Sequence, residues 1–264
     1  MKFAIIGAGN MGGALARGLA RGAKVETGDI TVSNPSQGKL DALKMDFPAM
    51  NITTDNCAAV ACADIVVLAV KPWKVQEVVE QLKDSLDYSR QAVASMVGGL
   101  SIAQLSEWLV KEDSLPATYT IIPNTAIATM NSMTFIASQR STEALDNELL
   151  EIFSELGKAM LVDESLIPAG TSLASCGIAY ALRYISAAIA GGTELGFTTK
   201  EAQEIVTQTM EGAMRLLVVN GQEPETEINK VTTPGGLTLK GLDAMETAGF
   251  SNSVKCGLFA SIKK

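Results

Sequence analysis

Short apolar runs rich in β-branched residues recur through the first part of the chain, and each predicts a buried strand. These strands are expected at residues 2–7, 30–34, 64–70, 92–97, 118–123, 133–138 and 159–163. Between several of them the apolar positions follow helical spacing. This spacing predicts one helix that ends near residue 22 and four others at 37–47, 73–86, 101–110 and 142–156. Strands that alternate with helices over short loops indicate a parallel sheet covered on both faces. We therefore expect an α/β domain with a doubly wound sheet at residues 1–162.

The strand pattern stops near residue 163, and the rest of the sequence predicts an all-helical domain at residues 163–264. One or two helices are expected at 165–195, and others at 199–220, at 226–231, from the turn at 232–238 to about 248, and at 251–262. Segment 165–192 consists mostly of small and apolar residues, with Arg183 as its only charge. A membrane span is usually richer in large apolar residues. We therefore expect this segment to be buried against a second copy of the chain, in a dimer or an assembly of dimers, with no membrane partner.

The amino-acid composition excludes several classes of function. The net charge is −8, which is the opposite of the basic surface that a nucleic-acid partner requires. The chain has no histidine, so it cannot build a Ser-His-Asp triad, a His-ligated zinc site or a histidine proton shuttle. Its four cysteines form no C-x-x-C pair and suggest no metal site. We interpret them as reduced thiols of a cytoplasmic protein.

A glycine motif lies between the first predicted strand and the first predicted helix. Gly7, Gly9 and Gly12 form a G-x-G-x-x-G, with Asn10 and Met11 between the last two glycines. In this context the first glycine permits a tight turn, the second lets the backbone approach a pyrophosphate, and the third lets the helix pack on the strand. The free N–H groups at the helix N-terminus favour phosphate. The motif therefore predicts a dinucleotide site.

The end of the second predicted strand bears on the choice of cofactor. A carboxylate at this place usually binds the ribose hydroxyls of NAD, but here the residues are Ser33, Asn34, Pro35 and Ser36. Three of these side chains can donate hydrogen bonds, and Lys39 follows one helical turn later. This pattern favours NADPH, with NADH possible. The same residues are also common turn formers.

A second segment is placed near the cofactor by topology. Ala69, Val70, Lys71 and Pro72 end the strand predicted at 64–70. In an open parallel sheet, ligands bind beyond the carboxyl ends of the strands. We therefore expect these four residues to contact the cofactor, although an exposed lysine beside a turn proline would look the same in the sequence.

Four motifs follow one another along the chain: GAGNMGGAL at 7–15, AVKP at 69–72, IPNTA at 122–126 and TPGGLT at 233–238. With these motifs the sequence resembles the pyrroline-5-carboxylate reductase family nearly from end to end. The resemblance implies a Rossmann-type domain followed by a helical dimerisation domain. It also implies reduction of 1-pyrroline-5-carboxylate to L-proline, the last step of proline biosynthesis, by NADPH or NADH.

The resemblance further implies roles for individual residues. Asn56 would contact the adenosine ribose of the cofactor, and Asn124 would lie near the nicotinamide. Thr238 would face the ring nitrogen of the substrate and serve as the catalytic residue. The residues expected to hold the substrate are Thr233, Gly235, Gly236, Leu237 and Thr238.

The chemistry of an imine agrees with this composition. An iminium already carries the charge that hydride neutralises, so its reduction needs little general-acid help and no histidine. The loop at 232–238 enters a predicted helix, and its amides can bind a carboxylate. The hydroxyl of Thr238 can hydrogen-bond the imine nitrogen, or it can act as an ordinary helix N-cap.

Other functions stay open at this point. One is a reductase of another imine or of the β-hydroxyacid dehydrogenase type, but the latter needs a helical lysine where this chain has Arg183. Another is a nucleotide-binding regulatory protein that has lost catalysis. The segment SCGIAY at 175–180 supports that alternative because it departs from the family pattern, whereas the intact TPGGLT loop argues against it.

Overall fold

The computed structural model describes residues 1–262, and these fall into two compact units that divide between Ser175 and Cys176. The sequence pattern instead predicts the boundary after residue 162. The difference arises because the next turns pack against the sheet: Ile167 joins a small apolar cluster with Ile122 and Ala137. A Cβ added to Gly170 would lie 2.7 Å from the ring of Phe135, so the helix backbone lies directly on that side chain.

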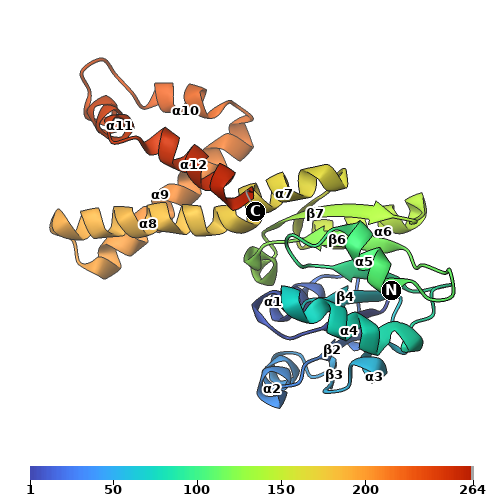
Figure 1. Cartoon of the computed structure of the whole chain (residues 1–264). Coiled ribbons are helices and arrows are strands. Elements are labelled where there is room, and N and C mark those ends of the chain that lie inside the picture. The colour runs from blue at the N-terminus through green and yellow to red at the C-terminus, as the bar shows by residue number, and fades with distance from the viewer. Residues whose placement is uncertain (263–264) are drawn as a thin grey trace. The chain divides into compact units, whose positions relative to one another are not determined.

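The first unit contains an eight-stranded sheet in the order β3-β2-β1-β4-β5-β6-β7-β8 (Figure 1). The strands are β1 (Phe3–Ile6), β2 (Ile30–Ser33), β3 (Asn51–Thr53), β4 (Ile65–Leu68), β5 (Ala92–Ser95), β6 (Thr118–Ile122), β7 (Ser132–Gln139) and β8 (Gly157–Leu161). All neighbouring pairs are parallel except β6 with β7. The order turns back at β1, so the carboxyl ends of β1 and β4 flank the topological switch point at which such sheets bind ligands.

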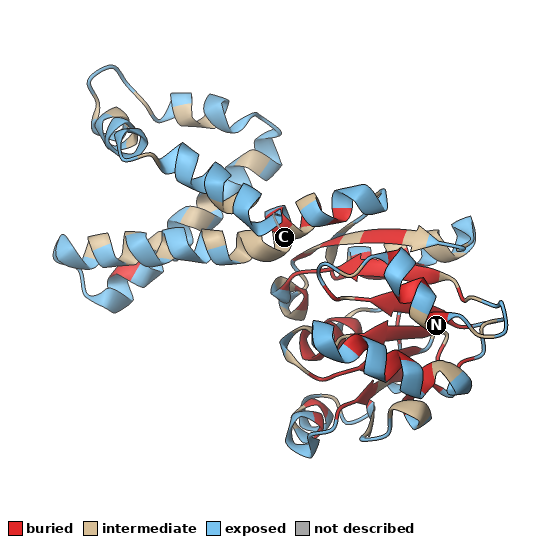
Figure 2. Cartoon of the chain, in the orientation of Figure 1, coloured by how far each residue is buried: buried red, intermediate tan, exposed pale blue. Residues whose placement is uncertain are grey.

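Helices cover both faces of the sheet. They are α1 (Asn10–Arg21), α2 (Gln37–Asp46), α3 (Asn56–Val60), α4 (Val75–Leu82), α5 (Ile102–Leu109), α6 (Glu143–Glu155) and α7 (Ile167–Gly170). Ile5 of β1 packs on the face with α1, α2 and α6, and its neighbour Ile6 packs on the face with α3, α4 and α5. Figure 2 shows the buried residues concentrated on the strands and on the inner faces of these helices. The predicted doubly wound α/β class is confirmed.

Two elements have no counterpart in the sequence analysis. Strand β3 has only three residues, two of them polar, and helix α3 has only five. The helix expected at 73–86 is also divided: α4 is flanked by 3₁₀ turns at Pro72–Lys74 and Lys83–Ser85. Segments this short carry too few periodic positions to be recognised from their pattern.

The second unit is all-helical, as predicted. Its helices are α8 (Gly177–Glu194), α9 (Thr199–Asn220), α10 (Pro224–Lys230), α11 (Leu237–Thr247) and α12 (Phe250–Ile262). A capping box of Thr198 and Glu201 starts α9, and Gly221 in the left-handed conformation ends it. Helices α8 and α9 pack closely because Gly192 and Ala202 meet, with 3.1 Å between an added Gly192 Cβ and the Ala202 Cβ.

A long apolar helical segment leads into this unit. A π-helical turn at Thr171–Cys176 joins α7 to α8, so the expected single or double helix is continuous but irregular. Glu164–Glu194 is long and apolar enough to cross a membrane by length and composition, and none of its apolar window is buried inside the described chain. A surface of this kind requires a partner, either lipid or protein.

Candidate functional site

The glycine motif forms a tight turn at the carboxyl end of β1. Gly7 has φ +110°, and a Cβ there would lie 2.6 Å from the carbonyl oxygen of Ala69. A Cβ on Gly12 would lie 1.9 Å from the carbonyl oxygen of Gly7. Both glycines are therefore required by close backbone contact. Gly9 differs, because a Cβ added there would meet nothing within 4 Å. The open space at Gly9 fits a ligand that approaches the backbone directly, as a dinucleotide pyrophosphate does.

Helix α1 begins at this open space. Gly9 is its N-cap and has no side chain that could accept from the first-turn amides, and the first turn holds no acidic residue. The amides of Asn10, Met11 and Gly12 precede the first intrahelical bond, which Gly13 donates to Gly9 at 2.8 Å. These amides and the helix dipole favour an anion at this end.

The end of β2 is bound tightly to the glycine turn. The amide of Gly7 donates to the carbonyl of Ser33 at 2.7 Å, and the amide of Ala8 donates to Oδ1 of Asn34 at 3.0 Å. Nδ2 of Asn34 in turn donates to the carbonyl of Ser36 at 3.0 Å. Asn34 therefore holds the turn in place through its own carboxamide, and only 8% of its surface is exposed.

Ser33 is fully buried, and its hydroxyl donates to Oδ1 of Asn56 at the start of α3. The sequence suggests that Ser33 and Asn34 donate to the cofactor, yet both side chains have partners inside the chain. Ser36 and Lys39 are exposed. Ser36 is the N-cap of α2 without a side-chain cap bond among the described residues, and the first turn of α2 holds no acidic residue. The start of α2 is thus the part of this edge that is open to a phosphate.

Residues 69–72 follow β4 on the other side of the glycine turn. Ala69 donates its amide to Ile6 at 2.9 Å, and Val70 Cγ1 lies 3.2 Å from a Cβ placed on Gly7. Lys71 is exposed and precedes the 3₁₀ turn that Pro72 begins. The structure therefore brings this segment and the glycine motif together at one edge of the sheet.

Asn124 lies just beyond the carboxyl end of β6. Its side chain is 5% exposed, and its Oδ1 accepts from the amide of Ala126 at 3.0 Å. Nδ2 donates at 3.4 Å to the carbonyl of Ala174, in the π-helical turn, and the hydroxyl of Ser175 donates to the carbonyl of Pro123 at 2.8 Å. The π-helical turn thus holds this loop at the edge where ligands bind.

The TPGGLT loop opens α11 in the helical unit. Gly235 has φ +73°, and a Cβ on Gly236 would lie 2.5 Å from Oγ1 of Thr233, so both positions favour glycine. Gly236 is the N-cap of α11, with no acidic residue in the first turn. Thr238 is exposed and lies inside that turn, so the N-cap explanation of Thr238 is wrong. The amides at the start of this helix, with Leu237 and Thr238 beside them, make this helix end a candidate anion site.

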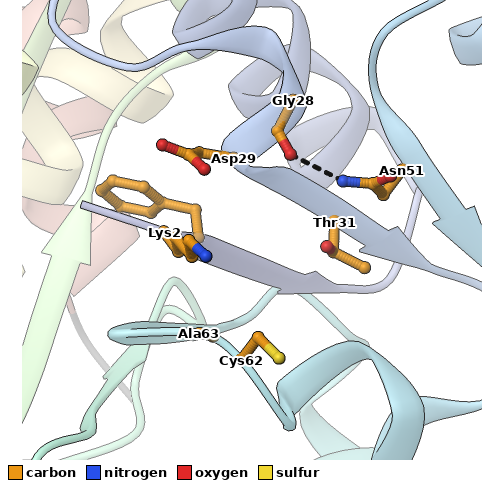
Figure 3. A pocket seen from close by; sticks show the side chains of 8 residues that line it. Lys2, Gly28, Asp29, Thr31, Asn51, Cys62 and Ala63 are labelled. Atoms are coloured by element: carbon orange, nitrogen blue, oxygen red, sulfur yellow. Dashed lines mark hydrogen bonds between the residues drawn. The ribbon is translucent and has the colours of Figure 1, made fainter.

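A small pocket lies at the opposite edge of the sheet, at the amino ends of the first strands. Lys2, Asp29, Asn51 and Cys62 are among its lining residues, and Nδ2 of Asn51 donates to the carbonyl of Gly28 at 2.7 Å (Figure 3). This pocket is separate from the glycine turn, which lies at the carboxyl ends. Among residues 1–262, Cys, Asp and Glu side chains form no cluster of three that could hold a metal ion.

Comparison with known proteins gives two family matches. Residues 164–264 match the model described as pyrroline-5-carboxylate reductase dimerisation, and residues 2–97 match the model described as NADP oxidoreductase coenzyme F420-dependent. The second match covers the glycine motif and the 69–72 segment. The first covers all of the helices from α7 onward.

Individual relatives match over the full chain. Pyrroline-5-carboxylate reductase 2 of Dictyostelium discoideum is 32% identical, with 100% of this chain and 91% of the relative covered. Reductase 1 of the same organism is 36% identical, but the chain spans only 48% of its length. Among solved structures, Plasmodium falciparum pyrroline carboxylate reductase with NADP bound is 25% identical, with a TM-score of 0.89 and coverage of 99% and 95%.

Proposed function

Because the chain belongs to the pyrroline-5-carboxylate reductase family, we propose that it reduces 1-pyrroline-5-carboxylate to L-proline, with NADPH as the reductant and NADH as a possible substitute. The observation that carries the proposal is the whole-chain identity with the Dictyostelium reductase 2, most of whose length is matched. That match spans both the glycine motif and the TPGGLT loop. We assign the cofactor to the glycine motif and the substrate to the TPGGLT loop.

The sheet unit would hold the cofactor. The amides at the start of α1 would bind the pyrophosphate, with Asn10 and Met11 beside it and Gly9 leaving the space. Residues 69–72 and Asn124 would flank the nicotinamide side, and Asn56 would face the adenosine ribose. When bound, the cofactor supplies the hydride that reduces the imine carbon.

The helical unit would hold the substrate. The amides of Gly235 and Leu237 at the start of α11 would bind the carboxylate, whereas the amide of Gly236, which the sequence also suggested, donates to the carbonyl of Thr233 at 2.8 Å and closes the loop. The Thr238 hydroxyl would donate to the nitrogen of the neutral imine and accept from the protonated one. Because an iminium needs no strong acid, one positioned hydroxyl without histidine is sufficient for the reaction.

We also propose a homodimer in a cytoplasmic setting. The apolar segment Glu164–Glu194 lies within the match to the dimerisation model, which favours a protein partner over lipid. The four cysteines are free, as is usual for a reducing compartment. Light scattering at micromolar concentration checks the assembly, and a monomer would contradict it.

The reaction is tested by turnover with the imine and NADPH. Thr238→Ala should lower kcat/KM about 10- to 150-fold, since a hydrogen bond to a charged group contributes about 1.5–3 kcal/mol. Thr238→Ser keeps the hydroxyl and should keep most activity. Both variants should melt at the same temperature as the unmodified chain, because Thr238 is exposed and is not the cap. If Thr238→Ala is as active as the unmodified chain, the catalytic role is wrong. Cofactor binding without turnover would favour the regulatory alternative.

A further inference from the structure

Three side chains form a hydrogen-bonded row beside the end of β2. The hydroxyl of Ser33 donates to Oδ1 of Asn56, and Nδ2 of Asn56 donates to Oε1 of Gln81 at 2.9 Å. The three residues come from β2, α3 and α4, which are separate in sequence. Gln81 is exposed and lies near the end of α4. It belongs to no sequence motif, so the sequence alone indicates no function for it.

This row fixes the carboxamide of Asn56 at both ends. An asparagine side chain has one carbonyl oxygen and two N–H donors. Ser33 occupies one acceptor site of the oxygen, and Gln81 takes one of the two N–H groups, so one N–H of Asn56 is left as a donor. Because the second anchor of the amide is Gln81, removing its oxygen would let the amide rotate about its own side chain. A donor that must be ordered during binding gives weaker affinity than one that is already held.

The fixed amide of Asn56 lies where the adenosine end of a dinucleotide is expected. In dinucleotide-binding sheets the adenosine ribose lies at the end of the second strand, where Ser33 and Asn56 meet. We propose that Gln81 is a positioning residue for the adenosine end of the cofactor and acts through Asn56. The inference rests on the proposed function only in taking the ligand to be a nicotinamide dinucleotide.

The matched variants are Gln81→Met and Gln76→Met in the full-length chain. Methionine has a similar length, and its thioether is only a weak acceptor for the Asn56 N–H. Gln76 is exposed on the same helix, and among the described residues no hydrogen bond of its side chain is seen, so it controls for the change in composition. The probes are NADPH and 2′,5′-ADP, which is its adenosine half, and calorimetry gives the dissociation constants.

Gln81→Met should raise the Kd of both probes about 2- to 10-fold, the usual effect of one hydrogen bond. The kcat at saturating NADPH should change less than twofold, and Gln76→Met should match the unmodified chain. In an Asn56→Ala background, Gln81→Met should have no further effect on Kd, because the route through Asn56 is already lost.

Two results would overturn the inference: an unchanged Kd in Gln81→Met, or the same loss in the Asn56→Ala background as in the unmodified one. The melting temperature of each variant shows whether the fold is intact, and Gln81→Ala repeats the test with a different side chain. Binding of 2′,5′-ADP needs no imine reduction. Failure of the proposed reaction would therefore appear in turnover alone, and failure of the Gln81 role in the Kd ratios alone.

Discussion

The glycine turn offers a pair of substitutions that separate ligand binding from folding. Gly9 has φ −69° and open space around an added Cβ, whereas a Cβ on Gly12 would lie 1.9 Å from the Gly7 carbonyl oxygen and 2.9 Å from the Ala69 Cβ. Gly9→Ala should therefore fold normally. It should even gain about 0.4–1 kcal/mol, since alanine restricts the unfolded chain and φ −69° suits it. Gly12→Ala must displace buried backbone and should lose about 1–3 kcal/mol or more.

For cofactor binding, the direct effect should come from Gly9→Ala, the variant that folds normally. The methyl group of Gly9→Ala would fill the space that the pyrophosphate needs, and the loss of one charge-assisted hydrogen bond costs about 1.5–3 kcal/mol. NADPH should then bind about 10- to 150-fold more weakly, at an unchanged or slightly higher melting temperature. For Gly12→Ala the melting temperature should fall by about 2–4 °C per kcal/mol lost. Calorimetric titration and thermal melts of the two variants give all four quantities. If Gly9→Ala binds NADPH like the unmodified chain, or melts as low as Gly12→Ala, the reasoning about this turn is wrong.

Three further predictions follow from exposed and buried side chains. Ser36→Asp should shift the kcat/KM preference from NADPH toward NADH, because a carboxylate at the N-cap of α2 repels a 2′-phosphate. It should cost no stability, since aspartate is a favourable N-cap residue. Ser33→Asp should instead lower the melting temperature, since that position is fully buried. Burial raises the pKa of Tyr88 to about 12, and the charges of Asp84 and Glu80 add to the shift. The stability that the neutral Tyr88 contributes is therefore present below pH about 10 and is lost as the pH rises toward about 12. Denaturant titrations over this pH range should show a smaller loss of stability in Tyr88→Phe than in the unmodified chain. Leu182→Glu, at a side chain 57% exposed on α8, should give a monomer in light scattering, and a dimer of unchanged stability would contradict the assigned interface.

The central strands were predictable because burial on both faces leaves a plain signal. β1 and β4 are continuous apolar runs, each residue of which is buried. β3 was not predictable, because an edge strand of three residues needs no apolar run; Asn51 at its start is exposed. Helix α3 was not predictable either, because its five residues, which begin at Asn56, carry too few periodic positions. That residue entered the candidate site only through the family resemblance.

The candidate site was predictable in its backbone and less so in its side chains. The spacing of Gly7, Gly9 and Gly12 predicts the turn, since close backbone contacts exclude a Cβ at Gly7 and Gly12 and Gly9 leaves open space for a ligand. The direction of the Ser33 and Asn34 hydrogen bonds depends on residues distant in sequence, Asn56 and Ala8, and no local pattern encodes them. For the same reason Gln81 could not be found before the hydrogen-bonded row was seen.

The helical unit shows a different limit of sequence reasoning. Its apolar positions predict helices correctly, yet within the described residues of this unit only Ala202 is buried in a single chain. Large side chains such as Leu182, Phe197 and Phe259 are half exposed or more. The free energy that stabilises most domains comes from burying such groups, so a lone copy of this unit lacks most of that term. Its folding is therefore expected to depend on assembly, and the TPGGLT loop at the start of α11 depends on the same helices. In this chain the second copy would act as part of the scaffold that keeps the TPGGLT loop in place.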